Sequence, residues 1–349
     1  LLEMCFSNME GGMEISLNKI KEDDIIKILF AENPGIVIQV KDKHKEEVKK
    51  ILEDAGIGYV KLGKPTEERH ILVEKGDATY QFGIDYLRDV WYSTSYLLDR
   101  KQSMNGCAKK RFENYKKQPL EFVFDKSFTG KLSQFGLNPD RRTPTGIKAA
   151  IIREKGTNGE REMAYMLYLA GFDVKDVTMT DLVSGRETLE DINFIVFCGG
   201  FSNSDVLGSA KGWAGAFLFN PKAKAALDNF YARKDTLSLG VCNGCQLMIE
   251  LNLINPDFTK KAKMLHNDSH KFESKFVGVT VPMNRSVMFG SLSGSKLGIW
   301  VAHGEGKFSL PYHEDKYNVV LKYSYDEYPG NPNGRRKRWI NSYGQTTYR

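Results

Sequence analysis

The stretch Ser238–Asn252, SLGVCNGCQLMIELN, places two cysteines between an apolar run and an amphipathic run. The first run is typical of a buried β-strand and the second of a helix. Cys242 stands two residues after Gly240 and two residues before Gly244. A sharp strand-to-helix turn lifts its central side chain above a sheet, and only small neighbours allow the strained backbone. The stretch therefore predicts an α/β sheet with a nucleophilic cysteine at its edge.

The predicted turn also suggests how Cys242 could react. The free N–H groups and the dipole of the following helix favour a thiolate, which can attack a carbonyl carbon. An oxyanion hole needs backbone N–H donors beside that carbon. We expect one donor from Asn243 and another from Gly199 or Gly200, which end a separate predicted strand. The alternative for these two glycines is an ordinary turn.

Other interpretations of the two cysteines stay open from the sequence alone. Cys242 and Cys245 have zinc-ligand spacing, but a structural zinc ion needs four ligands and the chain has no second Cys-x-x-Cys, although His266 and His270 could be added to the set. A redox pair would leave the flanking glycines unexplained. Two buried structural cysteines are the third alternative. We favour Cys242 as the nucleophile, Cys245 as a packing residue, and no metal.

Composition sets the broad class of the protein. The 349 residues allow one to three domains, and 41% hydrophobic with 27% charged residues is typical of a globular protein. No apolar run of about 18 residues predicts a membrane span, and no signal peptide opens the chain. Five cysteines, an odd number, argue against a disulfide framework and favour a reducing, cytoplasmic setting.

The net charge of +6 does not indicate nucleic-acid binding. Residues 335–349 hold five basic residues and no acidic residue, so the other 334 residues carry only +1. Because the excess is confined to this tail, it predicts neither a nucleic-acid partner nor a membrane surface for the main body.

The first part of the chain reads as a mixed α/β unit over residues 15–98. Val48, Ile51, Leu52 and Ala55 fall at helical spacing before Gly56. An aromatic-rich helix is expected over 86–99, and residues 99–145 have the charge and weak pattern of a linker. The predicted strands of this unit are 36–40, 57–64 and 69–76.

The second part alternates strands and helices from residue 147 to residue 254. This alternation predicts a parallel, doubly wound sheet flanked by helices, followed after residue 272 by short strands. The expected strands are 147–154, 192–201 and 236–242, and the expected helices are 156–171, 221–235 and 245–254.

Four motifs together resemble the glutaminase domain of the phosphoribosylformylglycinamidine synthase family, in its large single-chain form. They are VFCGGFSNSDVLGSAKGWA, LGVCNGCQLM, HNDSHKFESKF and WVAHGEGKF, in this order. LLEMCFSNMEGG at the start resembles the last lobe of the family's synthetase half, and YPGNPNG near residue 334 also matches. The resemblance implies a class I glutamine amidotransferase, with its flavodoxin-like sheet, after a smaller mixed α/β lobe.

The resemblance implies an activity and site residues. The cysteine attacks the side-chain amide of glutamine, a thioester forms, ammonia leaves, and water releases glutamate. ATP and Mg²⁺ then drive amidination of formylglycinamide ribonucleotide by the ammonia, at ligands lying mostly upstream of Leu1. By position, Cys242 matches the nucleophile, and Gly199, Gly200 and Asn243 match the oxyanion hole. The glutamine-binding residues implied are Gln246, Asn267, Ser269 and Phe272.

One element of the resemblance is missing. The family supplies its histidine base and carboxylate from a Pro-His-Pro-Glu segment after Asn-Pro-Asn-Gly, whereas residues 335–349 hold no histidine and no acid. His303 and Glu305 have the same spacing and are a lesser candidate for the base and its partner. The abrupt change suggests a reading-frame slip or a truncated gene model, and the absence of an initial Met suggests a fragment.

These observations predict a domain order and a function. We expect the synthetase lobe at 1–100, a linker at 101–145, the amidotransferase domain at 146–334 and an aberrant tail at 335–349. The expected parent enzyme is a ligase of purine biosynthesis, with slow glutamine hydrolysis by the chain as given. The rival interpretations are an inactive amidotransferase-like binding module and a stand-alone cysteine hydrolase.

Overall fold

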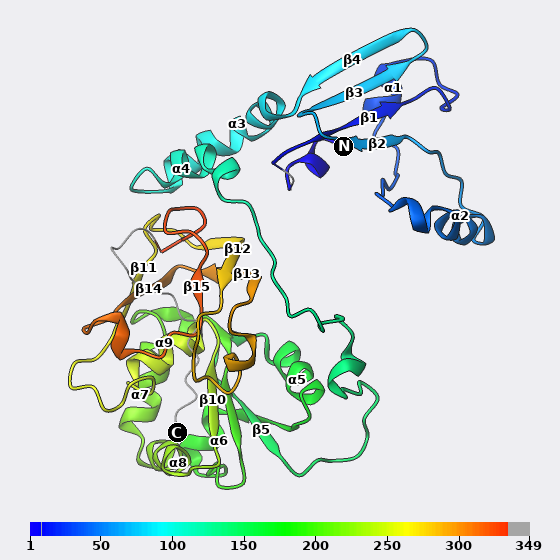
Figure 1. Cartoon of the computed structure of the whole chain (residues 1–349). Helices are drawn as coiled ribbons and strands as arrows, with labels where there is room; N and C mark the ends of the chain where they lie inside the picture. The colour runs from blue at the N-terminus through cyan, green and yellow to red at the C-terminus, as the bar shows by residue number, and fades with distance from the viewer. Residues whose placement is uncertain (8, 334–349) are drawn as a thin grey trace. The chain divides into compact units, whose positions relative to one another are not determined.

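A computed structural model describes residues 1–7 and 9–333 and divides the chain into two compact units (Figure 1). The first unit comprises Leu1–Lys101 and Phe112–Pro119, and the second comprises Gln102–Arg111 and the residues from Leu120 onward. Each unit has its own buried core, and the two are described separately. No helix within the described residues is long and apolar enough to cross a bilayer. The predictions for residues 335–349 lie outside the described part of the chain.

The first unit is built on a four-stranded mixed sheet of order β2-β1-β3-β4. β1 runs parallel to β3, and the other pairs are antiparallel. Its core packs Ile15 and Leu17 against Ile71 and Val73. The elements are β1 (Gly12–Ser16), α1 (Ile25–Phe30), α2 (Lys45–Asp54), β2 (Gly63–Thr66), β3 (His70–Lys75), β4 (Ala78–Gly83) and α3 (Ile84–Gln102).

Two strand predictions in the first unit are wrong in part or in whole. Residues 36–40 form no strand, and Ile36 is 90% exposed. The predicted strand 57–64 is extended only at its end, where Gly63 begins β2. The first stretch is apolar, but no described strand pairs with it. In the second stretch, the carbonyl oxygen of Leu62 still accepts from the N–H of Ser16 at 2.7 Å, just before β2 pairs with β1. The apolar face of α2 is also largely unburied, since Ile51 is 59% exposed.

The second unit confirms the doubly wound parallel sheet. All strands of the order β10-β8-β5-β7 are parallel. One face packs on α6, α7, α8 and α9, and the opposite face packs on α5 (Figure 1). The bounds are β5 (Lys148–Arg153), α5 (Glu160–Leu169), β7 (Asp173–Thr178), α6 (Met179–Ser184), β8 (Phe194–Phe197), α7 (Lys211–Phe219), α8 (Pro221–Ala232), β10 (Leu237–Gly240) and α9 (Asn243–Glu250).

The strand order determines where a ligand site belongs. The chain passes from β5 to β7 on one side and then to β8 on the other, so the winding reverses at β5 and β8. Open α/β sheets bind ligands outside the carboxyl ends of the strands at such a switch point. β8 leads into Gly199 and Gly200, and the adjacent strand β10 leads into Cys242.

Smaller elements complete the second unit beside that edge. β12 pairs antiparallel with β13 over eight residues, and β11 pairs with β14. The bounds are α4 (Cys107–Glu113), which crosses the division between the units, β6 (Thr157–Asn158), β9 (Gly199–Gly200), β11 (Lys263–His266), β12 (Glu273–Thr280), β13 (Lys296–His303), β14 (Glu305–Ser309) and β15 (Lys322–Tyr323).

Candidate active site

Cys242 occupies a strained turn between β10 and α9. Its φ of 51° and ψ of −106° are rarely adopted by a residue with a side chain. Strain of this kind costs on the order of 1–3 kcal/mol and persists only where the surroundings enforce it. Gly244 enforces it, because a Cβ there would lie 2.1 Å from the carbonyl oxygen of Phe197. The sheet and the helix therefore approach closely only because this position carries no side chain.

The backbone N–H groups of Asn243 and Gly200 lie close enough to the Cys242 sulfur to favour its charged form and so act to lower its pKa. Gly199 lies against the same residue, since a Cβ on it would lie 3.4 Å from the Cβ of Cys242. The thiol donates to the carbonyl oxygen of Ala302, at a sulfur–oxygen distance of 3.2 Å. The structure thus brings the three residues predicted for the oxyanion hole together at the cysteine. Ala302, at the end of β13, was not foreseen because its backbone carries the contact.

The prediction that Cys242 is a thiolate is wrong near neutral pH. Burial raises the pKa of the Cys242 thiol, the N–H groups of Asn243 and Gly200 oppose this, and the Asp205 carboxylate raises the pKa further. The net pKa lies above its ordinary value of 9.0. The helix N-terminus therefore does not compensate for the loss of solvent, and Cys242 is a thiol at neutral pH.

A pH profile tests this assignment. We expect alkylation of Cys242 by iodoacetamide to keep accelerating as pH rises through 9.0, because only the thiolate reacts and the pKa is raised. The rate would be followed by mass spectrometry of the Cys242 peptide between about pH 6 and about pH 10.5. A rate that levels off below about pH 8 would contradict the raised pKa.

The side chain of Asn243 is fully buried and organises the turn from beneath. Its Oδ1 accepts from the N–H of Ser202 at 3.1 Å. Its Nδ2 donates to Asp205 Oδ1 at 3.1 Å and to Gln246 Oε1 at 2.9 Å. These bonds connect the segment after β9 to the first turn of α9, so they hold the two predicted oxyanion donors in register. The role of Asp205 was missed, although it lies within a quoted motif.

Gln246 lies inside the scaffold. Its Nε2 donates to the carbonyl oxygen of Glu305 at 2.8 Å, and the residue is 6% exposed. Its Oε1 accepts from Asn243, so both polar atoms of the amide are bonded to protein groups. The bond to Glu305 connects α9 to β14. Contact of Gln246 with a substrate remains a prediction.

The residues predicted for a glutamine-binding wall differ in exposure. Asn267 and Ser269 are fully buried, whereas Phe272 is 47% exposed. The Phe272 ring lies 6.0 Å from the ring of Phe201, which follows the oxyanion glycines directly. Phe272 is thus the member of this set that faces outward beside the nucleophile turn. The buried Asn267 amide bonds to the carbonyl oxygen of His303, and the buried Ser269 hydroxyl bonds to Glu273, so these two residues stabilise the loop.

His303 and Glu305 do not pair as a base and its carboxylate. His303 Nδ1 lies 2.9 Å from Asn267 Oδ1, and Glu305 lies 3.7 Å from His266 instead. The His303 ring packs over Gly306. Burial lowers its pKa to about 4, the charge of Glu273 raises it in part, and Lys275 lowers it. A histidine with this pKa is neutral and a weak base near pH 7.

The two cysteines do not form a metal site in the described part of the chain. Cys245 is 7% exposed and packs with Ile249 and Phe308, as expected of a packing residue. Within residues 1–7 and 9–333, no three His, Cys, Asp or Glu side chains gather to hold a metal.

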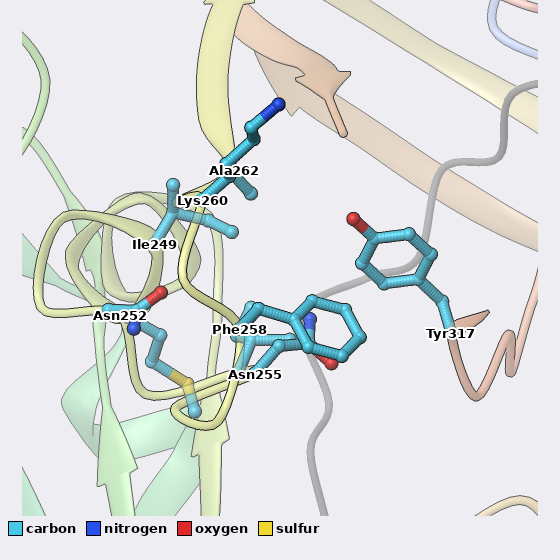
Figure 2. A pocket seen from close by; sticks show the side chains of 9 residues that line it. Ile249, Asn252, Asn255, Phe258, Lys260, Ala262 and Tyr317 are labelled. Atoms are coloured by element: carbon cyan, nitrogen blue, oxygen red, sulfur yellow. The ribbon is translucent and has the colours of Figure 1, made fainter. Parts of the chain in front are cut away.

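A cavity of about 480 Å³ lies beside the segment that follows β9, and its lining includes Ser202, Asn203 and Gly212. The pocket of Figure 2 lies at the C-terminal end of α9, has about 10 Å³ of space and would hold one water molecule. Cys242 is not among its lining residues.

A strained cysteine after a parallel strand, facing two backbone N–H groups, defines an acyl-transfer type of cysteine site. The family model of the CobB/CobQ-like glutamine amidotransferase domain matches residues 146–339. The chain therefore belongs to this glutamine amidotransferase family.

Curated relatives extend the match over both units. A probable phosphoribosylformylglycinamidine synthase of Arabidopsis thaliana is 35% identical over 360 residues, covering 95% of this chain and 25% of the relative. The Homo sapiens phosphoribosylformylglycinamidine synthase is 36% identical, covering 96% of this chain and 27% of the relative. The resemblance derived from the motifs is thereby confirmed. The chain spans about a quarter of the length of these relatives.

Solved structures also match. PurLQS from Thermotoga maritima is 26% identical and covers 54% of this chain and 78% of that chain, with a TM-score of 0.42. A glutamine amidotransferase from Thermotoga maritima is 16% identical and covers 48% of this chain and 64% of that chain, with a TM-score of 0.32.

Proposed function

We propose that this chain is the glutaminase part, with the end of the synthetase half, of a phosphoribosylformylglycinamidine synthase. The observation that carries the proposal is the strained turn that places Cys242 against Gly199, with the N–H groups of Gly200 and Asn243 near its sulfur. These groups would donate hydrogen bonds to the amide oxygen of glutamine and stabilise the negative charge that develops there when the sulfur attacks the carbon. The names of the curated relatives support formylglycinamide ribonucleotide as the molecule that receives the ammonia.

The proposed reaction begins with the Cys242 sulfur forming a bond to the side-chain carbonyl carbon of glutamine. The C–N bond then breaks, ammonia leaves with the thiol proton, and a thioester remains. Water cleaves the thioester to release glutamate and restore the thiol. The ammonia is proposed to replace the amide oxygen of formylglycinamide ribonucleotide and give the amidine, and this oxygen leaves in phosphate as ATP is converted to ADP. ATP and Mg²⁺ belong to that second reaction, in the whole protein rather than in the site described here.

The proposed reaction needs a general base for Cys242, and neither the described residues nor residues 335–349 offer a clear one. The described structure records no hydrogen bond between Cys242 and a histidine, and residues 335–349 contain neither histidine nor acid. Loss of the base in a nucleophile–base pair typically lowers turnover by several orders of magnitude. We therefore propose that the chain as given binds glutamine and turns it over slowly. This feature is what favours the rival, an inactive amidotransferase-like binding module.

Protection of Cys242 by substrate tests the proposal. We expect L-glutamine to slow alkylation of Cys242 by iodoacetamide in a saturable way, because the bound amide covers the sulfur. Asparagine, which is one methylene shorter, and glutamate, which carries a charge, are matched controls that should protect at least about tenfold less well. Equal protection by all three, or none by glutamine, would overturn the glutamine site and favour a cysteine hydrolase of another specificity.

A further inference from the structure

Residues 102–111, here called the strap, are bonded to the loop that carries Asn267, Ser269 and Phe272. The N–H of Met104 donates to the carbonyl oxygen of Ser269 at 2.9 Å. Asn105 Nδ2 donates to the carbonyl oxygen of Asp268 at 2.7 Å, across 163 residues of sequence. Two consecutive carbonyl groups of the loop are therefore held by the strap, and the loop cannot shift without breaking these bonds.

The end of the strap reaches a buried charge at the base of the same loop. Arg111 Nη2 lies 3.0 Å from Glu273 Oε2, and Glu273 is 1% exposed. The Glu273 carboxylate also accepts from the Ser269 hydroxyl and from the Tyr328 hydroxyl, and it pairs with Lys275 at 2.9 Å. Removing one partner of a buried charge is strongly unfavourable, so the carboxylate couples the position of the strap to that of Ser269.

Arg111 is the partner whose charge does not change near neutral pH. Burial lowers the pKa of Lys275 to about 8, the Glu273 charge raises it in part, and Arg111 lowers it. The guanidinium of Arg111 therefore supplies the constant positive charge for this carboxylate. The Cζ of Arg111 lies 5.2 Å from the centroid of the Tyr328 ring. The strap therefore also contacts the tyrosine whose hydroxyl bonds Glu273.

Contacts continue from the loop to the nucleophile. Asn267 Nδ2 donates to the carbonyl oxygen of His303 at 2.6 Å, and its Oδ1 faces the His303 ring. The residue before His303 is Ala302, whose carbonyl oxygen accepts from the Cys242 thiol. The loop is thus bonded to the strap through Asp268 and Ser269, and to the end of β13 through Asn267. The Cys242 thiol bonds to the same end of β13.

We propose that the strap is a positioning element for the glutamine site, with Arg111 as its principal residue, so that displacement of the strap weakens glutamine binding. The inference rests on the proposed glutamine site at Cys242. Gln102 is both the first strap residue and the last residue of α3, whose other residues belong to the first unit. The strap is therefore covalently continuous with the first unit through α3.

Cys107 provides a direct readout of strap position, because it lies in the strap and is 1% exposed. Binding free energies are reciprocal, so if a docked strap favours glutamine, bound glutamine must favour the docked strap. In the full chain, L-glutamine is expected to slow alkylation of Cys107 by about tenfold, in parallel with Cys242. Alkylation of Cys198, which is buried in the sheet, should not change.

Substitutions complete the test. We expect Arg111→Ala to raise the half-protecting glutamine concentration by about tenfold and to accelerate Cys107 alkylation, with Arg111→Lys intermediate. Asn105→Ala, which removes the exposed side chain that bonds Asp268, is expected to show about a threefold effect. Arg141→Ala is the matched control, since Arg141 makes a comparable ion pair with Asp173 away from the loop.

The outcomes separate the two proposals. If glutamine protects Cys242 in the unchanged chain but leaves Cys107 alkylation unaltered, and Arg111→Ala and Asn105→Ala bind glutamine normally, the positioning role is wrong and the glutamine site stands. If glutamine fails to protect Cys242 in the unchanged chain, both proposals fall. If Arg111→Ala also exposes Cys198, that variant is unfolded, and Asn105→Ala with the Cys107 readout decides.

Discussion

Gly244→Ala is expected to destabilise the second unit by about 3 kcal/mol or more, at the upper end of the cost of overpacking a core. The added Cβ would lie 2.1 Å from the carbonyl oxygen and 2.6 Å from the carbonyl carbon of Phe197. These are backbone atoms of β8, in the middle of the parallel sheet, so they cannot move aside cheaply. The free energy of unfolding, measured with urea, would show the loss.

Gly304→Ala is the matched control for that substitution. Gly304 lies between β13 and β14, and a Cβ there would meet nothing within 4 Å. We expect a change within about 0.5 kcal/mol. If Gly244→Ala were as mild as Gly304→Ala, then α9 would not pack on β8 as closely as described, and the enforced turn at Cys242 would be wrong.

Asn243→Leu is expected to destabilise the protein by about 3–5 kcal/mol, even though leucine has a similar size. The substitution leaves the Ser202 N–H, the Gln246 amide oxygen and the Asp205 carboxylate without the side chain that now satisfies them. Unsatisfied buried polar groups lose their bonds to water without replacement. Thermal and urea unfolding would measure the loss.

Asn220→Ala serves as the comparison for the second substitution. The Asn220 side chain caps α8 through one bond to the N–H of Ala223. Loss of such a cap costs about 1 kcal/mol. If Asn243→Leu cost no more than this, the network beneath the nucleophile turn would not be the support we describe.

The parallel sheet and the cysteine turn could be predicted from the sequence because local signals and tertiary packing agree there. The apolar runs of β5 and β8 are continuous, as expected of strands buried on both faces. The spacing of Gly240, Cys242 and Gly244 is itself the mechanical requirement of the turn. Pro221 at the first position of α8 and the side chain of Asn220 specify that helix start in the same local way.

Other features depend on groups distant in sequence and could not be predicted. The run at residues 36–40 has strand character, but strand formation needs a neighbour, and none is supplied. The raised pKa of Cys242 depends on burial and on the Asp205 charge, which outweigh the helix terminus. The buried state of Gln246 and Asn267 follows from bonds to the backbone of Glu305 and His303, which no spacing rule indicates.

The most direct test of the account uses a diazoketone in which CHN₂ replaces the amide nitrogen of L-glutamine. Attack by a thiol releases N₂ and leaves a stable thioether, so the labelled peptide identifies the nucleophile. The account predicts a single adduct on Cys242, slowed by L-glutamine and absent with the D-isomer of the reagent. An adduct on Cys245 instead, or no adduct even above pH 9.0, would contradict the assignment of Cys242 as the nucleophile of a glutamine site.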